Sequence, residues 1–154
     1  AARYGIESAV VDKKEYRDRG VREEKILSLM REKNIEFIVF AGFMTILSAD
    51  FVSAYEGRII NVHPALIPSF CGPGYYGLKV HEQVLARGVK VTGATVHYVT
   101  EICDGGPIIA QKAVEVKEGD TPETLQKRVM REAEWVILPE AVELVCKKLQ
   151  GIEG

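Results

Sequence analysis

This 154-residue sequence is poor in the features that mark secreted, zinc-binding and membrane-spanning proteins. Its three cysteines are an odd number at wide spacing, without a Cys-x-x-Cys pair, which argues against a disulfide framework and a zinc site. Its longest apolar stretch, residues 38–44, is far shorter than the roughly 20 residues that a helix needs to cross a bilayer. We expect no signal peptide at the start of this sequence. We therefore expect a cytoplasmic protein from a reducing compartment.

A strong excess of either charge is also missing. The chain has 20 Lys and Arg residues against 22 Asp and Glu residues, whereas a general nucleic-acid binder carries a clustered basic excess. We therefore expect neither nucleic acid nor a membrane as a partner. With 47% hydrophobic and 27% charged residues, the composition is that of one globular domain, because a chain of this size buries roughly 70% of its unfolded surface.

The beginning of the sequence lacks an initiator methionine and a glycine-rich turn. No glycine-rich turn precedes residue 41, although such a turn before a helix is a common way to hold a phosphate group. We expect position 1 to be a cut in a longer sequence. Residues 8–11 are a short apolar run, and we expect them to form a buried strand.

Hydrophobic periodicity and turn residues predict an alternation of strands and helices. We expect a first helix at residues 21–33, with Ile26, Leu29 and Met30 on its buried face, and then a strand buried on both faces at residues 37–40. A short helix capped by Ser48 and ended by Gly57 should follow, and then a strand at 58–62 and a helix at 79–87 ended by Gly88. We expect strands at 91–99 and 107–116 to pair with each other. The last helix should start at Thr121 and be broken or kinked by Pro139 before residues 141–149.

This alternation is typical of an α/β protein with an open, mostly parallel twisted sheet and helices on both faces. In such sheets, ligands bind beyond the carboxyl ends of the strands. The segments that directly follow expected strands are residues 41–47, 61–64 and 100–106. Residues 64–77 form a long loop, and loops of that length inside compact domains are usually functional. We expect the ligand site among these four segments.

Three side chains in these segments have the chemistry of a proton-transfer site. Asn61 and His63 are two residues apart at a strand end, so both project from the same face of the sheet. The amide can donate to a developing oxyanion while the histidine handles a proton. Asp104 lies in a turn before two glycines, and a carboxylate beside His63 would raise the pKa of the imidazole and fix its tautomer. No serine or cysteine stands in a nucleophile elbow, so we expect no covalent intermediate.

Each candidate also has a purely structural interpretation. A histidine at a strand end, like His63, is more often a hydrogen-bonded, partly buried residue than a catalyst, and the residues at Asp104 are simply good turn residues. We expect His81 to be solvated on a polar helix face and His97 to pack in its strand or support the site. With only three histidines and no ligand spacing, we expect no metal site.

Four segments carry a resemblance to a known family. They are Ala41-Gly42-Phe43-Met44-x-Ile46-Leu47, Asn61-Val62-His63-Pro64-Ala65-Leu66-Ile67-Pro68, Gly93-Ala94-Thr95-Val96-His97-Tyr98-Val99 and Asp104-Gly105-Gly106-Pro107-Ile108-Ile109. In this order they closely resemble the phosphoribosylglycinamide formyltransferases, the folate-dependent enzymes of purine synthesis. The resemblance runs from about residue 19 to residue 149. It implies a Rossmann-like formyltransferase fold, and a single formyltransferase domain over residues 1–154 that is incomplete at its N-terminus.

The resemblance also implies roles for individual residues. It implies a cis peptide bond between Ile67 and Pro68. The implied catalytic residues are Asn61, His63 and Asp104. The implied contacts to 10-formyltetrahydrofolate are Arg19, Met44, Thr45, Ile46, Leu47 and Asn61, with backbone groups of residues 44–47 facing the pterin ring. The implied contact to the ribose of the nucleotide substrate is Glu134.

The implied reaction is formyl transfer from 10-formyltetrahydrofolate, as co-substrate, to the amine of glycinamide ribonucleotide (5′-phosphoribosylglycinamide). Two alternatives stay open. A formyltetrahydrofolate deformylase would share the amide, the imidazole and the carboxylate, but those relatives typically carry a second histidine where this chain has Pro64, which favours transfer. A noncatalytic folate-binding fragment is the other alternative. The sequence also leaves a homodimer open.

The start of the chain departs from the family. Relatives begin with a strand, a Gly-Ser-Asn turn that binds phosphate and a helix, and no such segment precedes Arg19. We therefore expect this chain alone to bind folate weakly and to transfer formyl groups at no useful rate. Because the first strand of a doubly wound sheet usually lies in the middle, we also expect a gap in the sheet, an edge covered by a partner, or a rearranged start at residues 8–11.

Overall fold

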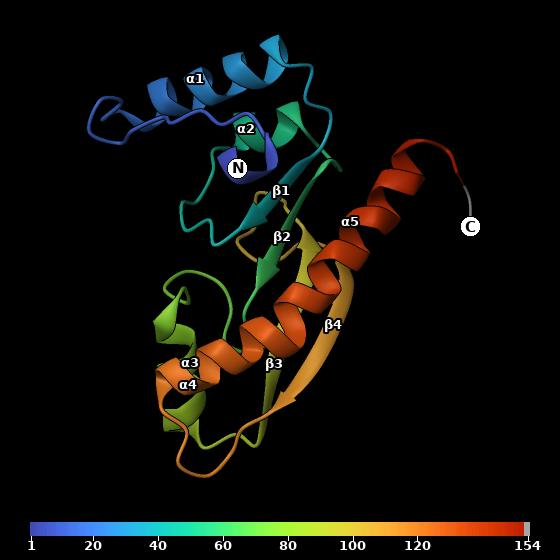
Figure 1. Ribbon diagram of the computed structural model, residues 1–154. Coiled ribbons are helices and arrows are strands. Elements are labelled where there is room, and N and C mark those ends of the chain that lie inside the picture. Colours follow the sequence, from blue (N-terminus) through green and yellow to red (C-terminus); the bar gives the residue numbers. More distant parts are fainter. Residues whose placement is uncertain (153–154) are drawn as a thin grey trace.

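The computed structural model describes residues 1–152, apart from the side chain of residue 2. Figure 1 shows one sheet with helices against both of its faces. The sheet has four strands in the order β1 (Ile38–Ala41), β2 (Ile59–His63), β3 (Val91–Tyr98) and β4 (Ile108–Glu115). The helices are η1 (Ala2–Tyr4), α1 (Arg19–Glu32), α2 (Ala49–Ala54), α3 (Leu78–Arg87), α4 (Pro122–Val129), η2 (Met130–Glu134) and α5 (Trp135–Leu149). Within residues 1–152, no helix is both long and apolar enough to cross a membrane.

The sheet is mixed. Strands β1 and β2 run parallel, whereas β2 pairs with β3 and β3 with β4 in antiparallel fashion, so the prediction of a mostly parallel sheet is wrong for the described strands. The predicted pairing of residues 91–99 with residues 107–116 is therefore confirmed. In the β2–β3 ladder, Asn61 lies directly opposite His97. Because directly opposite side chains share one face of the sheet, this register already brings two candidate site residues together.

The predicted helix signals act as expected. The Ser48 side chain accepts a hydrogen bond from the Phe51 amide at 3.2 Å and caps α2. Thr121 caps α4 through a reciprocal pair of bonds with Thr124. Gly88 ends α3 with a φ of 71°, in the left-handed region that favours glycine. These local signals set where the loops between them begin and end.

Two hydrophobic clusters hold the helices on the sheet. The larger one lies between β2, β3 and the helices α3 to α5, with Ile60, Val96, Leu125 and Ile137 among its buried members. The smaller one packs α1 and α2 on β1 and β2 through Leu27, Ile38, Phe51, Tyr55 and Ile59. In Figure 1 these helices occupy different sides of the sheet, which confirms the predicted α/β class with helices on both faces.

Two predictions about the first strands are wrong. Residues 8–11 form no strand; they are exposed or half-buried and lie outside the sheet, because no neighbouring strand in the described residues pairs with them. The strand at β1 is not buried on both faces, since Val39 is 38% exposed. Burial alternates along β1, with Ile38 and Phe40 on the smaller cluster and Val39 and Ala41 exposed, so the apolar run is covered on one face only. The sheet thus has an open edge at β1 and a start that differs from the predicted one.

Of the predicted break or kink at Pro139, the break is wrong, because α5 continues through this residue. The irregular part of the helical run comes one turn earlier. Residues of η2 form a π-helical segment between α4 and α5. Proline lacks the N–H that would bond to the carbonyl four residues before it, and a wider π turn just ahead of it is one way for a helix to accommodate that loss.

Candidate active site

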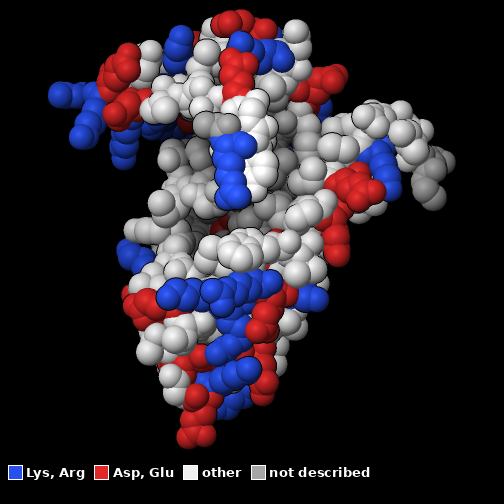
Figure 2. Space-filling view, viewed as in Figure 1, with Lys and Arg blue, Asp and Glu red and all other residues white. Residues whose placement is uncertain are grey.

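A cavity of about 550 Å³ is lined by the loop after β1, the end of β2 and residues of α3, α4, η2 and α5. Residues 41–47, 61–64 and 100–104 all line it, and so does the part of the long loop from Gly72 to Gly77. The segments predicted to hold the ligand therefore line one cavity, and the binding of a ligand there stays a prediction. Figure 2 shows that the charged side chains gather on the upper and lower parts of the molecule, and that mostly uncharged side chains surround the region between them. The wall of the cavity is largely apolar, which suits a flat organic ligand.

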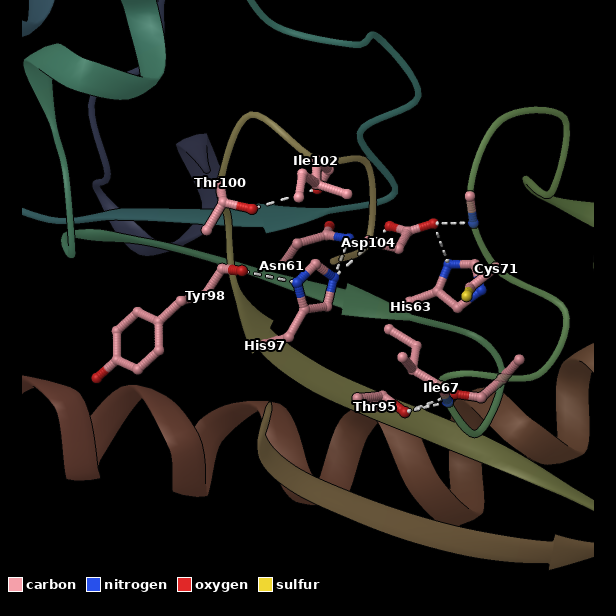
Figure 3. A network of polar contacts seen from close by, with 12 residues as sticks. Asn61, His63, Ile67, Cys71, Thr95, His97, Tyr98, Thr100, Ile102 and Asp104 are labelled. Atoms are coloured by element: carbon pink, nitrogen blue, oxygen red, sulfur yellow. Dashed lines mark hydrogen bonds and ion pairs between the residues drawn. The ribbon is translucent and has the colours of Figure 1, made fainter. Parts of the chain in front are cut away.

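The three predicted catalytic side chains converge at this cavity (Figure 3). Asn61 and His63 come from β2, and Asp104 comes from the loop between β3 and β4. His63 Nδ1 lies 3.6 Å from Asp104 Oδ2. Because β3 runs antiparallel to β2, its carboxyl end lies beside the start of β2, and the loop folds back to bring Asp104 to the histidine.

Asp104 is held in a conformation that the neighbouring loop supports. Its φ is 52°, a left-handed value that is uncommon outside glycine. The Gly72 amide donates to Asp104 Oδ2 at 2.8 Å. Burial alone would raise the pKa of Asp104. This effect is outweighed by the hydrogen bonds from the His97 side chain and the Gly72 N–H and by the charges of His63 and His97, so the pKa lies below its ordinary value. Asp104 is therefore ionised at neutral pH and contacts two histidines.

His63 is buried, with 4% of its surface exposed. Its Nε2 lies 2.8 Å from the carbonyl oxygen of Phe70, and since a carbonyl only accepts, Nε2 carries a hydrogen in this arrangement. Burial lowers the pKa of His63, and this outweighs the opposing effects of the Phe70 carbonyl and of Asp104. Asp104 thus acts in the predicted direction, but the net shift is the reverse of the predicted one. The nitrogen that gains or loses a proton is Nδ1, which faces the carboxylate.

His97 fixes the orientation of the Asn61 amide. His97 Nδ1 lies 2.8 Å from the Tyr98 carbonyl and donates to it, which orients the ring so that Nε2 faces Asn61 and Asp104. Asn61 Nδ2 lies 3.4 Å from that Nε2. His97 Nε2 is also 3.6 Å from Asp104 Oδ1. The predicted supporting part of His97 is confirmed, because it touches two of the three candidate catalytic side chains.

The prediction that His81 is solvated is wrong. His81 is fully buried and lines the cavity, and neither of its ring nitrogens has a hydrogen-bond partner. Burial, and then the charge of His63, lower the pKa of His81 to about 4. The signal was present in the sequence, because His81 precedes Val84 by three residues and so shares the buried face of α3. Polar residues lie on both sides of His81 in the sequence, and the prediction therefore placed it on the solvated face and not with Val84.

The expected folate contacts fall into two groups. Met44, Thr45, Ile46 and Leu47 all line the cavity, as the resemblance implies. Arg19 does not line it. The Arg19 side chain donates from Nε to Glu23 at 2.9 Å, and about half of it is exposed. A contact between Arg19 and a ligand therefore stays a prediction.

Glu134 lines the same cavity from the π-helical segment. Burial raises the pKa of its carboxyl, and no charged neighbour offsets this. Short π segments are frequent at functional sites. The sequence did not predict this turn, nor the neighbouring Trp135, which is the only tryptophan of the chain and also lines the cavity.

The remaining predicted features near the site concern sulfur, metals and a peptide bond. Cys71 and Cys103 flank Asp104 as free thiols, and burial raises the pKa of both. Among residues 1–152, no group of three or more His, Cys, Asp and Glu side chains is arranged to hold a metal ion. The Ile67–Pro68 peptide bond is cis, as the resemblance predicts.

The family pattern described as formyl transferase matches residues 1–142. The chain therefore belongs to the formyl transferase family. It is 41% identical over 155 residues to phosphoribosylglycinamide formyltransferase of Bacillus subtilis, covering 100% of this chain and 74% of that relative. It is also 48% identical over 146 residues to the trifunctional purine biosynthetic protein adenosine-3 of Gallus gallus, covering 95% of this chain but only 14% of that protein. The resemblance to phosphoribosylglycinamide formyltransferases is thus confirmed.

Solved structures show the same fold. The crystal structure of phosphoribosylglycinamide formyltransferase from Anaplasma phagocytophilum superposes with a TM-score of 0.83 at 39% identity, over 96% of this chain and 67% of that one. A formyltetrahydrofolate deformylase from Pseudomonas syringae pv. tomato superposes with a TM-score of 0.75 at 31% identity, over 92% of this chain and 45% of that one. The predicted Rossmann-like formyltransferase fold is confirmed, and it is common to transferases and a deformylase.

Proposed function

We propose that this chain carries the site for transfer of a formyl group from 10-formyltetrahydrofolate to the primary amine of glycinamide ribonucleotide, in purine biosynthesis. The observation that supports this most directly is the convergence of Asn61, His63 and Asp104 at a cavity walled by residues 44–47. Such a group can stabilise one oxyanion through the amide and transfer one proton through the imidazole and carboxylate. The largely apolar wall suits the flat pterin and benzoyl rings of the folate.

The reaction needs stabilisation of one tetrahedral intermediate. The amine attacks the formyl carbon, the new C–N bond forms, and the carbonyl oxygen takes up negative charge. Asn61 Nδ2 donates to that oxyanion, the positive charge of protonated His63 stabilises it from close by, and Asp104 stabilises the charged imidazole. The bond from the formyl carbon to N10 of the folate then breaks, and the proton lost by the amine reaches N10, directly or through the histidine and water.

Two further residues have proposed binding roles. Glu134 accepts hydrogen bonds from the ribose hydroxyls, a role supported by its position on the cavity wall without a charged partner. Arg19 contacts the folate if its pair with Glu23 opens. We also propose a cytoplasmic location, which fits the three free cysteines of the chain.

A product analysis tests the proposed function. The purified chain is incubated with 10-formyltetrahydrofolate, with and without glycinamide ribonucleotide, and the formylated nucleotide and free formate are quantified. Formylated nucleotide that depends on the nucleotide substrate and disappears in His63→Ala supports transfer. Formate release without the nucleotide would instead indicate a deformylase, and folate binding without either product would indicate a folate-binding fragment. Pro64, next to His63, favours the first result, because the deformylases that the sequence resembles carry a second histidine there.

A further inference from the structure

The segment that walls the proposed folate site has few attachments of its own. Within residues 1–152, the backbone of residues 43–47 makes no hydrogen bond to the rest of the chain. The segment is also exposed, apart from half-buried Leu47. Free backbone groups are what a heteroaromatic ligand needs in order to bind there, but a segment without bonds has no fixed shape unless its two ends are held.

The first end of the segment is held by apolar contact only. Phe40 of β1 and Phe43 stack with ring centroids 4.3 Å apart and an interplanar angle of 11°. Between them Gly42 adopts a φ of 71°, which turns the chain away from the strand. At the other end, Leu47 packs on the smaller hydrophobic cluster. None of these contacts specifies where a backbone N–H or carbonyl points.

The second end is held by a buried carboxylate from another helix. Glu23 of α1 is 5% exposed, and it accepts hydrogen bonds from the Ser48 amide at 3.2 and 3.4 Å and from the Ser48 hydroxyl. That hydroxyl in turn accepts from the Phe51 amide at the start of α2. Arg19 donates to the same carboxylate at 2.9 Å. One acidic side chain thus joins α1, the end of the 43–47 segment and the first turn of α2.

We propose that Glu23 is a positioning residue for the folate-binding segment: through Ser48, its carboxylate holds residues 44–47 in the extended arrangement that presents their backbone groups to the cavity. This inference rests on the proposed function, because it assumes that a folate is the ligand of that segment. Glu23 itself does not line the cavity and touches no ligand. Its effect passes through one bonded neighbour.

The carboxylate form is essential to this arrangement. Glu23 accepts from three donor groups at once, and an ionised carboxylate has about four acceptor sites for them. A glutamine has a single acceptor oxygen, and its amide group would face a donor from either Ser48 or Arg19. Glu23→Gln therefore keeps the size of the side chain and removes part of the attachment. Glu23→Asp keeps the charge but shortens the reach.

Binding of 5-formyltetrahydrofolate, a stable folate, tests the proposal. Trp135 reports binding by fluorescence, since it is the only tryptophan and lines the cavity. We expect Glu23→Gln to raise the Kd about tenfold, as loss of a charge-assisted bond commonly does, and Glu23→Asp to recover part of the affinity. The matched control is Glu24→Gln, which makes the same change at an exposed neighbour that pairs only with Arg31. Ser48→Ala and Glu23→Gln should be non-additive, because they break the same link.

A second readout separates positioning from general loss of stability. Amide hydrogen exchange should become faster at residues 44–51 in Glu23→Gln and stay unchanged in the strands β2 and β3. Equal folate affinity in Glu23→Gln and the unchanged chain, or faster exchange throughout the fold, would overturn the inference. Failure of the unchanged chain to bind the folate at all would overturn the proposed function instead, and the inference with it.

Discussion

Asp104 Oδ2 lies 3.6 Å from His63 Nδ1 and also accepts a 2.8 Å hydrogen bond from the Gly72 amide, so one carboxylate oxygen joins the candidate base to the long loop. The histidine is bound to that loop a second time through the Phe70 carbonyl. The loop after β2 and the turn after β3 therefore hold the imidazole from both sides. A substitution at Asp104 should therefore first change the pKa of His63.

Asp104→Asn should lower the pKa of His63 further. Asp104 is one of the groups that raise this pKa against the effect of burial, and an amide removes its charge. The limb of the pH–rate profile that reports His63 should then move to lower pH. NMR titration of the His63 ring protons measures the shift directly. A higher pKa in the variant would be incompatible with the role assigned to Asp104.

In a complete version of the enzyme, His63→Ala should lower the rate of the chemical step by about 100-fold or more, because general acid–base groups commonly contribute 10²- to 10⁴-fold. Folate affinity should barely change, since the cavity wall at residues 44–47 is untouched. Single-turnover kinetics and equilibrium binding of 5-formyltetrahydrofolate measure the two quantities separately. Near-normal turnover in the variant would remove His63 from the mechanism.

The sequence was sufficient for the candidate catalytic residues because each follows from a local rule. Asn61 and His63 share a face because a strand has a period of two, and Asp104 precedes glycines that allow a tight turn. Their convergence was then a consequence of the antiparallel β2–β3 register. The burial of Glu23 depends instead on contacts with distant segments, and no local pattern reports it, whereas His81 shares the spacing of the buried face of α3. The exposure of Val39, like the burial of Glu23, depends on which segment, if any, packs on its face of β1.

His81 should remain neutral until the pH falls to about 4. Its pKa is lower in the folded protein than the ordinary value of 6.5, so the unfolded chain takes up the proton first as the pH falls. Folding stability is therefore unaffected above pH 6.5 and declines between pH 6.5 and 4, by about 3 kcal/mol from this residue. His81→Leu should flatten this part of the stability profile, as measured by urea unfolding at several pH values. An unchanged slope would mean that His81 is accessible to protons in the folded state.

Asp120 and Arg128 form a buried pair that ties the start of α4 to its last turn. Both nitrogens of the Arg128 fork contact Asp120 at 2.5 Å, and this holds the pKa of the carboxyl at about 2. The stabilisation is present above the unfolded pKa of 3.8 and is lost as the pH falls toward 2. Asp120→Asn should cost about 2 kcal/mol at neutral pH and remove this acid dependence. Glu143→Gln, which breaks an exposed pair with Lys147, is the control and should change the free energy of unfolding little.

Gly106→Ala should displace the turn that carries Asp104, whereas Gly105→Ala should be tolerated better. A Cβ on Gly106 would lie 1.8 Å from the Tyr98 carbonyl oxygen, which is backbone of β3 and cannot move aside. A Cβ on Gly105 would lie 2.4 Å from Cγ2 and 2.9 Å from Cβ of Ile102, so it also requires a shift, but of a loop residue that is 71% exposed and not of strand backbone. Overpacking of a rigid site costs about 1–3 kcal/mol, so Gly106→Ala should lower the melting temperature and, by moving Asp104 away from His63, the turnover as well. Thermal unfolding and single-turnover assays of the two variants make the comparison. Equal effects of the two substitutions would mean that the turn yields as a whole and does not hold Asp104 in place.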